Sequence, residues 1–579
     1  MKPQLSIAFG QYSGAGAKPE NQDFHGALVP DDGTLATKGI AIAIADGIST
    51  SEVGAQAAET AVKSFLTDYF ATSEAWSVRT SGERVISATN SWMFANNDRV
   101  RPRVEGVSRE AIGLICTLSA LVFKSRAAHI FHIGDAQIAL VRAGRLLALT
   151  DPHQVHIGGG RSYLARALGT GARVDIDYRQ LVVQQGDVFV LTTDGIHEYL
   201  DDERIAGIAS DPDSSADARA EAMAQAAAAA GSPDNLTVVL AQVESLPDGE
   251  IEDLIGSEAI LPPAPMLRSG EEFEGYAILR PLHSGSRSHV YLARDVHTDT
   301  RVALKVPSTE HSTDERQMHA LLLEEWVARR VDNPHVLKAA PQNRARGHAY
   351  SVTEYVEGQP LDEWMADASR EDLASVRSII KQIASGLHAL HRKEMVHRDL
   401  RPRNVLIDAE GTARIIDFGS TQVAGLDELA PHPEDGMFAG TMQYSAPELY
   451  RGEPATHRSD LYSLGVIAYQ MLTGKLPYGP RVSAADTRAA QRKLHYVPIT
   501  ETNPAVPDWM DAAIACAVAI DPARRYSELS EFTYDLAHPN PTLTAPDPRP
   551  WMARKPERVW QVISTMLAIA LAISLWPGG

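Results

Sequence analysis

The most informative stretch of the chain is Met395-Val-His-Arg-Asp-Leu-Arg-Pro-Arg-Asn-Val-Leu-Ile-Asp408, followed by Ile415-Ile-Asp-Phe-Gly419. The polar residues Asp399, Asn404 and Asp417 lie close to apolar residues in these two segments. A chance hairpin that buries a few polar side chains can give either segment alone. The two segments together, in this order and at this spacing, are much harder to obtain by chance.

The two segments resemble the catalytic loop and the magnesium-binding segment of protein kinases. Phosphoryl transfer needs a base near the attacking hydroxyl and cations on the phosphates. The resemblance implies that Asp399 is the catalytic base and that Asn404 and Asp417 hold Mg²⁺. Arg401 replaces the Lys that is usual after the base in Ser/Thr kinases. It keeps a positive charge for the γ-phosphate, and we expect Ser/Thr side chains of proteins as substrates.

The nucleotide-binding half of a kinase is expected upstream of this stretch. Lys305, in Val302-Ala-Leu-Lys-Val306, would bind the α- and β-phosphates of ATP. Glu324 is expected to pair with Lys305; Glu325 is the alternative, and the other of the two is expected to be solvated. Thr353 would be the gatekeeper. The rest of the implied ATP-binding set is Gly285, Val290, Ala303, the backbone at Glu354 and Val356, and Leu406.

The glycine loop is the weakest kinase motif. In Leu282-His-Ser-Gly-Ser-Arg-Ser-His-Val290 only Gly285 remains of the usual three glycines. His283 and Ser288 occupy the other two positions, so we expect loop closure over ATP to be altered.

The later kinase motifs follow in order. Gly440-Thr-Met-Gln-Tyr-Ser-Ala-Pro-Glu448 resembles the end of an activation segment, in which Thr441 is a candidate phosphosite. Ser459–Gly465 and Asp521–Arg525 match structural motifs of the large lobe. We expect Glu448 and Arg525 to form a buried ion pair.

The length and composition of the chain limit the number of domains and the classes of function to consider. The chain has 579 residues, more than one hydrophobic core usually holds, so at least two domains are expected. Its net charge of −20 argues against general nucleic-acid binding, which needs clustered Lys and Arg. Its two cysteines, Cys116 and Cys516, exclude a disulfide framework and a cysteine zinc site.

Residues 1–245 have a pattern of strands with helices between them. The helical patterns cover Ser51–Phe70 and Ala216–Ala230. The strand-like runs are Ile40–Ala45, Ile112–Phe123, His129–Ile133, Leu140–Arg142, Val188–Thr192 and Leu236–Val243. This pattern predicts sheets covered by helices.

Aspartates mark the ends of several of these runs. They are Asp23, Asp46 (followed by Gly47), Asp135, Asp194 and Asp234. Each can be a simple turn residue, because Asp-Gly pairs favour turns. Several carboxylates brought into one site repel one another unless cations neutralise them, and all-oxygen ligands suit Mg²⁺ or Mn²⁺.

This set, in this order, resembles the metal-dependent Ser/Thr protein phosphatases of type 2C, the PPM family. The resemblance implies a β-sandwich flanked by helices and hydrolysis by a water bound to two metals. Asp46 would bridge the metals with the Gly47 carbonyl on one of them, and Asp194 and Asp234 would complete their ligands. Asp23 would hold metal-bound water, and Asp135 would serve a third metal.

Three positions depart from that family. Lys18 stands where the family often has a phosphate-binding Arg, and a Lys cannot bind phosphate bidentately. Gln137 replaces an Arg that is common after the Gly-Asp motif. Ile48 stands where some members have a His that is proposed as the general acid.

Two Pro-containing stretches divide the chain. Residues 246–272 are expected to be a linker, either a solvated tether or a segment docked on a domain. Residues 538–558 form a second linker. Trp560–Trp576 then runs without charge for about 26 Å of helix, near the lower limit for a membrane span. Arg554, Lys555 and Arg558 before it favour a cytoplasmic start; the alternative is an amphipathic or core-docking helix.

The sequence therefore predicts a multidomain protein. Its parts are an α+β phosphatase β-sandwich flanked by helices (1–245), a linker (246–272), a two-lobed α+β protein kinase (273–537), a second linker (538–558) and one C-terminal transmembrane helix (559–576). We expect an enzyme of the inner membrane, with both catalytic domains cytoplasmic. It would phosphorylate proteins with ATP and Mg²⁺ and dephosphorylate phosphoproteins, including its own activation segment, with Mg²⁺ or Mn²⁺. The alternatives are that one domain is a regulatory pseudoenzyme or that the chain is a non-catalytic phosphoprotein-binding scaffold.

Overall fold

A computed structural model of the chain describes residues 4–100, 113–157, 161–247, 261–285, 288–308, 315–341, 346–367, 372–427, 443–543 and 564. It divides into two compact units. The first comprises residues 1–358, 385–399 and 414–440, and the second comprises residues 359–384, 400–413 and 441–579. Each unit is described by itself below.

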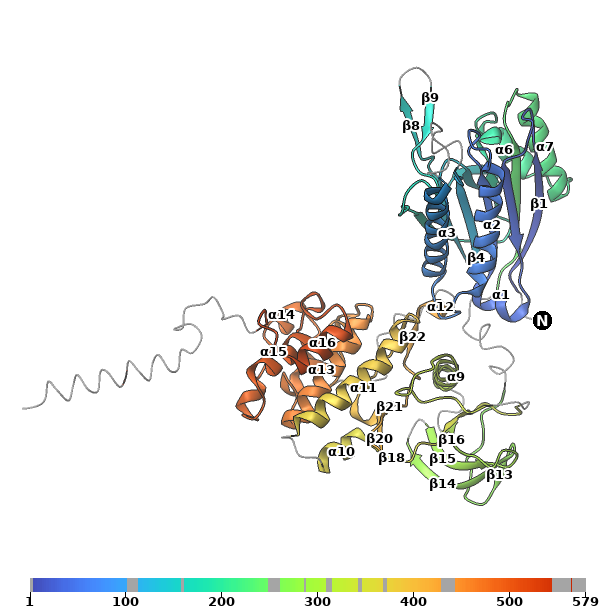
Figure 1. Cartoon of the computed structure of the whole chain (residues 1–579). Coiled ribbons are helices and arrows are strands. Elements are labelled where there is room, and N and C mark those ends of the chain that lie inside the picture. Colours follow the sequence, from blue (N-terminus) through green and yellow to red (C-terminus); the bar gives the residue numbers. More distant parts are fainter. Residues whose placement is uncertain are drawn as a thin grey trace, which may run out of the picture. The chain divides into compact units, whose positions relative to one another are not determined.

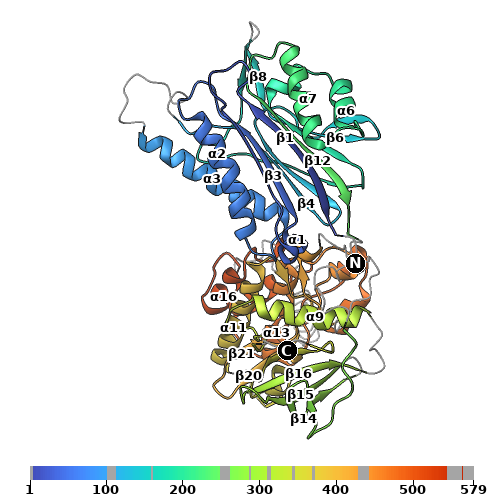
Figure 2. The ribbon, with the colours of Figure 1, turned by 90° about the vertical axis from the view of Figure 1, so that its right-hand side faces the viewer.

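The first unit begins with two five-stranded sheets (Figures 1 and 2). In spatial order, one sheet contains β1 (Ser6–Gly14), β12 (Leu236–Ser245), β11 (Val188–Thr192), β6 (Gln137–Arg142) and β7 (Arg145–Ala148). The other contains β10 (Asp177–Val182), β5 (Ala127–Ile133), β4 (Leu118–Lys124), β3 (Ile40–Asp46) and β2 (Asp23–Leu28). Every strand pair in these two sheets is antiparallel.

Strand β3 explains how this part packs. Ile40, Ile42 and Ile44 point into the core that both sheets share, together with Phe123 and Phe189. The alternate residues, Ala41, Ala43 and Ala45, lie in a second core that includes Ala57, Ala61 and Phe65 of a helix. Because side chains alternate along a strand, one run of residues serves both cores, with large residues inside the sandwich and small ones under the helix.

Helices cover the outer face of each sheet (Figure 2). On the β3 side these are α2 (Gly54–Ala71) and α3 (Val78–Val100). On the other side they are α6 (Asp202–Ala209) and α7 (Ala216–Ala229). Short elements complete this part: α1 (Asp32–Lys38), α5 (Asp194–His197), β8 (Gln154–Ile157) and β9 (Arg161–Leu164). The predicted helix-flanked sandwich is confirmed.

Two of the predicted elements differ in detail. The expected strand Ile112–Phe123 begins only at Leu118. Before it, Cys116 forms an isolated antiparallel bridge with Gly47, and the Thr117 amide donates to the Asp46 carbonyl at 2.8 Å. Helix α3 was not predicted. Its Thr, Ser and Asn residues blur the apolar stripe on which such a prediction depends.

The first unit also holds a second sheet system, again antiparallel. Its strands, in order, are β13 (Glu272–Phe273), β14 (Tyr276–Ser284), β15 (Ser288–Asp295), β16 (Arg301–Pro307) and β17 (Ser351–Glu354), accompanied by helix α9 (Glu315–Arg330) (Figure 1). A two-stranded pair, β19 (Met395–Val396) and β22 (Gln422–Val423), precedes the turn of helix α12 (Ala424–Asp427).

The described end of the first linker is docked on this sheet. Pro263 forms a parallel bridge with Ala349, and Ala264 and Leu267 are buried in the core under β14–β17. For these residues the docked alternative holds, and the solvated tether is wrong. Residues 248–260 lie outside the described part of the chain.

The second unit is mostly helical. Helix α11 (Leu373–His391) runs from it into the first unit. Its other elements are α10 (Leu361–Asp367), η3 (Pro402–Asn404), β20 (Val405–Asp408), η4 (Leu449–Arg451), α13 (His457–Thr473), η5 (Gly479–Ala484), α14 (Arg488–Gln491), η6 (Ile499–Glu501), α15 (Asp508–Ala517), η7 (Pro522–Arg524) and α16 (Leu529–Ala537). The short strands β18 (Gly358–Pro360) and β21 (Ala413–Ile415) lie where the units meet in sequence.

Among the described residues, no helix is both long and apolar enough to span a bilayer. The predicted anchor at 559–576 falls, apart from residue 564, outside the part of the chain that the structure describes.

Candidate active sites

The first candidate site starts with two aspartates on neighbouring strands. Asp23 opens β2 and Asp46 closes β3, and the antiparallel register pairs them directly. Gly47 follows at a close approach of two backbones, where an added Cβ would lie 2.2 Å from the Gly54 carbonyl oxygen. A side chain at this position would therefore require the backbone to shift.

The other expected acids converge on this pair. Asp194 is the first residue of α5, Asp135 lies in the β5–β6 turn, and Asp234 lies just before β12. Burial raises the pKa of Asp46 well above its ordinary value, and the charges of the other four aspartates raise it further. Burial likewise raises the pKa of Asp23 to about 6 and that of Asp194 to about 7.

These acids suit a divalent cation. The buried Oδ1 of Asp23 has no hydrogen-bond partner among the described residues, and mutual repulsion opposes ionisation of the cluster. A cation would remove both penalties. In the described ranges, no three His, Cys, Asp or Glu side chains are already arranged so that they could hold a metal ion. Some of the carboxylates are instead held by protein donors.

Sequence reasoning missed these hydrogen-bond partners of the aspartates. Thr193 Oγ1 donates to Asp23 Oδ2 at 2.8 Å, and Gln154 Nε2 donates to Asp135 Oδ2 at 3.0 Å. Thr117 Oγ1 accepts from the Asp46 amide at 2.9 Å. Thr193 directly precedes Asp194, so its position was visible in the sequence; Gln154 and Thr117 gave no such signal.

Lys18 lies at the same site. Its ammonium is 3.1 Å from Asp234 Oδ1 and donates to Ser49 Oγ at 3.1 Å. The side chain is 30% exposed, so it is accessible from solvent. A metal ligated by Asp234 would compete with this ammonium, and displacement would leave the ammonium available to a phosphate.

The second candidate site contains one basic and two acidic side chains. Lys305 on β16 forms an ion pair with Glu324 on α9, and its ammonium lies 3.8 Å from Asp417 Oδ1. Burial lowers the pKa of Lys305, but the charges of Asp417 and Glu324 outweigh burial and hold it above its ordinary value. The lysine therefore stays cationic beside a proposed metal ligand.

Glu325 corrects one sequence expectation. It is not solvated: its carboxylate is almost fully buried and accepts from Arg346 at 2.6 and 2.8 Å. It also bonds the guanidinium of Arg329 one turn along α9. Two adjacent glutamates thus have separate partners, because successive helical side chains point in different directions.

Strand register assembles the expected nucleotide contacts. Val290 on β15 pairs with Lys305, and Ala303 pairs with Thr353 on β17. Glu354 pairs with Val302 at the end of the same strand. In the glycine loop, the Gly285 amide donates to the Ser288 carbonyl at 3.0 Å, which closes the β14–β15 turn.

Asp399 and Asp417 belong to the first unit as well. The Asp399 amide donates to His397 Nδ1 at 3.3 Å, and Arg398 between them has a φ of 69°, a strained value for a side-chain-bearing residue. An added Cβ at Gly419 would lie 3.2 Å from the Ala320 carbonyl oxygen, so the Asp417–Gly419 segment packs closely on α9.

The second unit carries Arg401, Asn404 and Leu406. Arg401 Nε donates to Asn404 Oδ1 at 3.4 Å, and Leu406 lies on β20. This unit also holds the predicted ion pair: Arg525 donates to both carboxylate oxygens of Glu448, at 2.8 and 2.7 Å, with both side chains buried. That prediction is confirmed.

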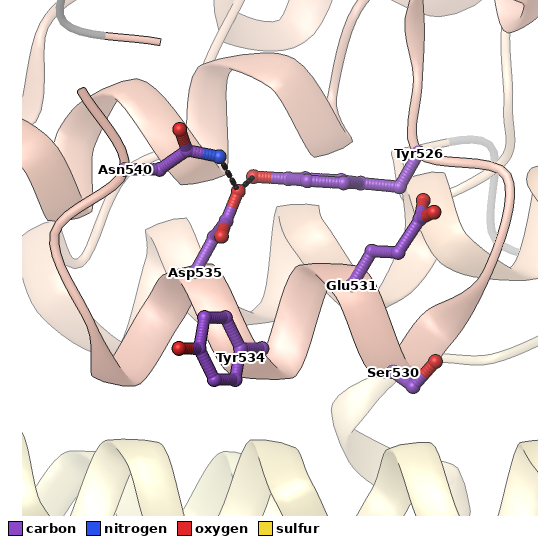
Figure 3. Close-up of a pocket in the computed structure, with 6 residues that line it drawn as sticks. All are labelled: Tyr526, Ser530, Glu531, Tyr534, Asp535 and Asn540. Carbon is purple, nitrogen blue, oxygen red and sulfur yellow. Dashed lines mark hydrogen bonds between the residues drawn. The ribbon is translucent and has the colours of Figure 1, made fainter. Parts of the chain in front are cut away.

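A separate pocket of about 540 Å³ lies in the second unit (Figure 3). In Figure 3 Asp535 accepts from both Tyr526 and Asn540, at 3.0 and 2.7 Å. These bonds tie α16 to the segments on either side of it. The pocket is lined by Tyr526, Ser530, Glu531, Tyr534, Asp535 and Asn540, none of which belongs to the predicted sites.

Two family models match the chain. Residues 13–241 match protein phosphatase 2C, and residues 276–542 match the protein kinase domain. The Ser/Thr protein kinase PknL of Mycobacterium tuberculosis is 32% identical over 262 residues, which are 45% of this chain and 64% of that protein. PrkC of Bacillus subtilis is 30% identical over 268 residues, 46% of this chain and 41% of that protein. The chain thus covers less than two thirds of these relatives.

Solved structures match in two groups. The M. tuberculosis PknI kinase domain is 25% identical and covers 47% of this chain and 99% of its own, with a TM-score of 0.37. The catalytic domain of PstP in complex with two manganese ions is 22% identical, covering 42% of this chain and 100% of its own, with a TM-score of 0.34. On the family matches and the site residues, the chain joins a protein phosphatase 2C domain to a Ser/Thr protein kinase domain.

Proposed function

We propose that the chain is a bifunctional signalling enzyme that phosphorylates Ser/Thr residues of proteins with ATP and dephosphorylates phosphoproteins through a binuclear metal site. The observation that carries the proposal is that both domains keep their reactive residues. One keeps the Lys305–Glu324 pair beside Asp417, and the other keeps the five-aspartate cluster around Asp46.

In the kinase, Lys305 holds the α- and β-phosphates, and Asp417 and Asn404 hold Mg²⁺. Asp399 accepts the proton of the substrate hydroxyl, and Arg401 supplies positive charge at the γ-phosphate. Val290, Ala303 and Leu406 would contact the adenine, and the backbone at Glu354 and Val356 would form hydrogen bonds with it. Positioning and electrostatics supply most of the catalysis in such a site.

In the phosphatase, bound Mg²⁺ or Mn²⁺ would supply a nucleophilic water at neutral pH and polarise the phosphate. Asp46, the Gly47 carbonyl, Asp194 and Asp234 hold the two metals. Asp23 would orient a water molecule at this site, and Asp135 would help to hold a third ion. Lys18 would contact the substrate phosphate, and its present position 3.1 Å from the Asp234 carboxylate places the ammonium at the site.

The phosphatase also acts on the activation segment of its own kinase. A tethered domain has an effective concentration on the order of millimolar toward the rest of its chain. Phosphate on this segment is therefore kept low at steady state, and kinase output follows the balance of the two activities. Thr441, the candidate phosphosite, lies outside the described residues.

The location proposed for the enzyme is the inner membrane, with one C-terminal span at 559–576 and both catalytic domains in the cytoplasm. The uncharged run between Trp560 and Trp576, with Arg and Lys before it, supports this. The full-length chain is expected to resist carbonate and high salt, whereas a 1–550 truncation partitions into the soluble fraction. Release of the full-length chain by carbonate contradicts the span.

The two activities are tested separately, on a protein substrate with labelled ATP and on a phosphopeptide. Asp399→Asn should abolish only label transfer, and Asp46→Asn only phosphopeptide hydrolysis. If Asp399→Asn still transfers label and Asp46→Asn still hydrolyses the phosphopeptide, the assignment is refuted. A wild-type chain active in one assay alone identifies the other domain as a regulatory pseudoenzyme. A chain inactive in both that still binds phosphoproteins is a scaffold.

A further inference from the structure

The first unit contains a set of contacts between its phosphatase and kinase residues. They come from the short connection between α2 and α3, from the start of α3, and from the end of β4. Trp76 Nε1 donates to the Arg392 carbonyl at 2.9 Å, and the Ser77 amide and Thr80 hydroxyl donate to the Glu394 carboxylate at 2.8 and 2.5 Å.

Two further contacts extend this surface. Glu74 forms an ion pair with Arg330 at 2.7 Å. Lys124 Nζ donates to the Gly425 carbonyl at 2.7 Å, and the Gly425 amide donates to the Ala75 carbonyl at 3.0 Å. We call this set of contacts the docking surface.

The docking surface is closely fitted. Lys124 is only 1% exposed, and a buried ammonium needs its acceptors. A Cβ added to Gly425 would lie 2.6 Å from the Glu74 carbonyl oxygen and 2.9 Å from that of Trp76. Glu394 has a φ of 56°, an unfavourable backbone conformation for a non-glycine residue, and both of its carboxylate oxygens accept phosphatase donors.

The kinase residues on this surface belong to the elements that carry its reactive groups. Arg330 is the last residue of α9, the helix that bears Glu324. Gly425 lies in α12, directly after β22 and downstream of Asp417. Glu394 immediately precedes β19, which pairs with β22 and leads to Asp399. The phosphatase therefore contacts all three elements at points away from the reacting groups.

We propose that the phosphatase domain is a positioning domain for the kinase, which it holds in the state with the Lys305–Glu324 pair formed. Docking fixes the end of α9 through Arg330 and the Asp417 segment through Gly425. This effect rests on the kinase activity proposed above but needs no phosphatase chemistry. It is separate from removal of phosphate from the activation segment.

The test uses the full-length chain with Asp46→Asn, which removes phosphate hydrolysis as a cause. Glu74→Gln with Thr80→Val removes one ion pair and one hydroxyl donor from the phosphatase side. We expect kcat/KM for ATP to fall by about tenfold, a usual size for coupling between sites, with KM for the protein substrate unchanged. Glu83→Gln and Thr60→Val, exposed changes on α3 and α2, are the matched controls and should have no effect.

A charge exchange separates positioning from damage to the fold. Glu74→Arg alone should lower kcat/KM, and Arg330→Glu added to it should restore part of the loss. In a chain that keeps Asp46, hydrolysis of a small phosphoester by Glu74→Gln/Thr80→Val should match that of the wild type. Unchanged or increased kinase activity in Glu74→Gln/Thr80→Val overturns the proposal.

A different result would refute the proposed kinase activity itself. If the Asp46→Asn chain with an intact docking surface transfers no phosphate, the proposed kinase function is wrong. Hydrogen exchange at residues 422–427 then decides on docking: exchange should be faster in Glu74→Gln/Thr80→Val than in the controls. Equal protection in all of these chains overturns the docking surface.

Discussion

Asp23 and Asp46 lie directly opposite each other on β2 and β3, and the Oδ1 of Asp23 is buried without a hydrogen-bond donor among the described residues. Two facing carboxylates on adjacent strands destabilise a fold unless a proton or a cation compensates them. These carboxylates therefore lower the folding stability of the phosphatase domain at the proposed metal site.

This cost makes the stability of the metal-free protein depend on pH. The folded pKa values, about 6 for Asp23 and about 7 for Asp194, lie above the ordinary value of 3.8 expected for the unfolded chain. The folded state thus binds these protons more tightly, so its stability is highest below the unfolded pKa and falls as the pH rises through the folded values. In chelator, the Tm of the phosphatase domain should fall between about pH 4 and pH 8.

Added Mn²⁺ should reverse this trend, because a cation replaces the lost protons. The rise in Tm on adding Mn²⁺ should be larger at pH 8 than at pH 5. Asp46→Asn should raise the Tm in chelator and shrink the response to Mn²⁺. A response that is equal at both pH values in the wild-type chain would contradict a metal site at these acids.

Lys18 should affect metal and substrate in opposite directions. Lys18→Ala removes the ammonium beside Asp234, so Mn²⁺ should bind more tightly, while KM for a phosphopeptide rises because a phosphate-binding cation is lost. Calorimetric titration with Mn²⁺ and steady-state kinetics measure the two effects. Lys18→Arg is the charge-preserving control and should keep KM low. Weaker metal binding in Lys18→Ala would show that Lys18 supports the site rather than competing for Asp234.

The neighbouring glutamates of α9 should separate activity from stability. Glu324→Gln removes the anion that holds Lys305, so kinase kcat/KM should fall at least about tenfold with a small change in Tm. Glu325→Gln leaves Arg346, which is 2% exposed, without its charged partner, at a cost of roughly 3–5 kcal/mol of stability. Thermal melts and ATP kinetics on both variants decide this. The reverse pattern would exchange the roles assigned to the two residues.

The ion pair of the large lobe should act on stability alone. Glu448→Ala leaves the Arg525 guanidinium buried and unpaired, which should cost roughly 3–5 kcal/mol in denaturant unfolding of the kinase. The Arg403–Asp362 pair, in which the Arg403 side chain is 69% exposed, is a surface control in the same unit, and Arg403→Gln should cost about 0–1 kcal/mol. Equal losses in the two variants would mean that burial of the Glu448–Arg525 pair is not what stabilises this lobe.

The sequence was most informative where chemistry fixes short motifs. Asp399, Asn404 and Asp417 predict a kinase because the motifs that contain them occur in a fixed order and at a nearly fixed spacing. Apolar runs such as Ile40–Ala45 predict buried strands. The pairing of Asp23 with Asp46 depends on strand register, which no local pattern supplies. Which of Glu324 and Glu325 pairs with Lys305 depends on which side chain faces β16. The sequence alone did not decide between the two.

Other features had no signal in the sequence at all. Lys124 resembles any surface lysine, and its burial against Gly425 follows from tertiary contacts alone. Ala264 and Leu267 lie in a Pro-containing segment that resembles a linker, yet they pack under a sheet. The anchor at 559–576 remains a prediction from the sequence.

The most direct measurement is a pulse–chase of labelled phosphate on the purified full-length chain. With labelled ATP and Mg²⁺, Asp46→Asn should take up more label than wild type, and Asp399→Asn should take up none. After a chase with excess unlabelled ATP and Mn²⁺, wild type should lose label as inorganic phosphate, whereas Asp46→Asn retains it. Label that never appears, or that leaves Asp46→Asn as fast as wild type, would contradict a chain with both activities.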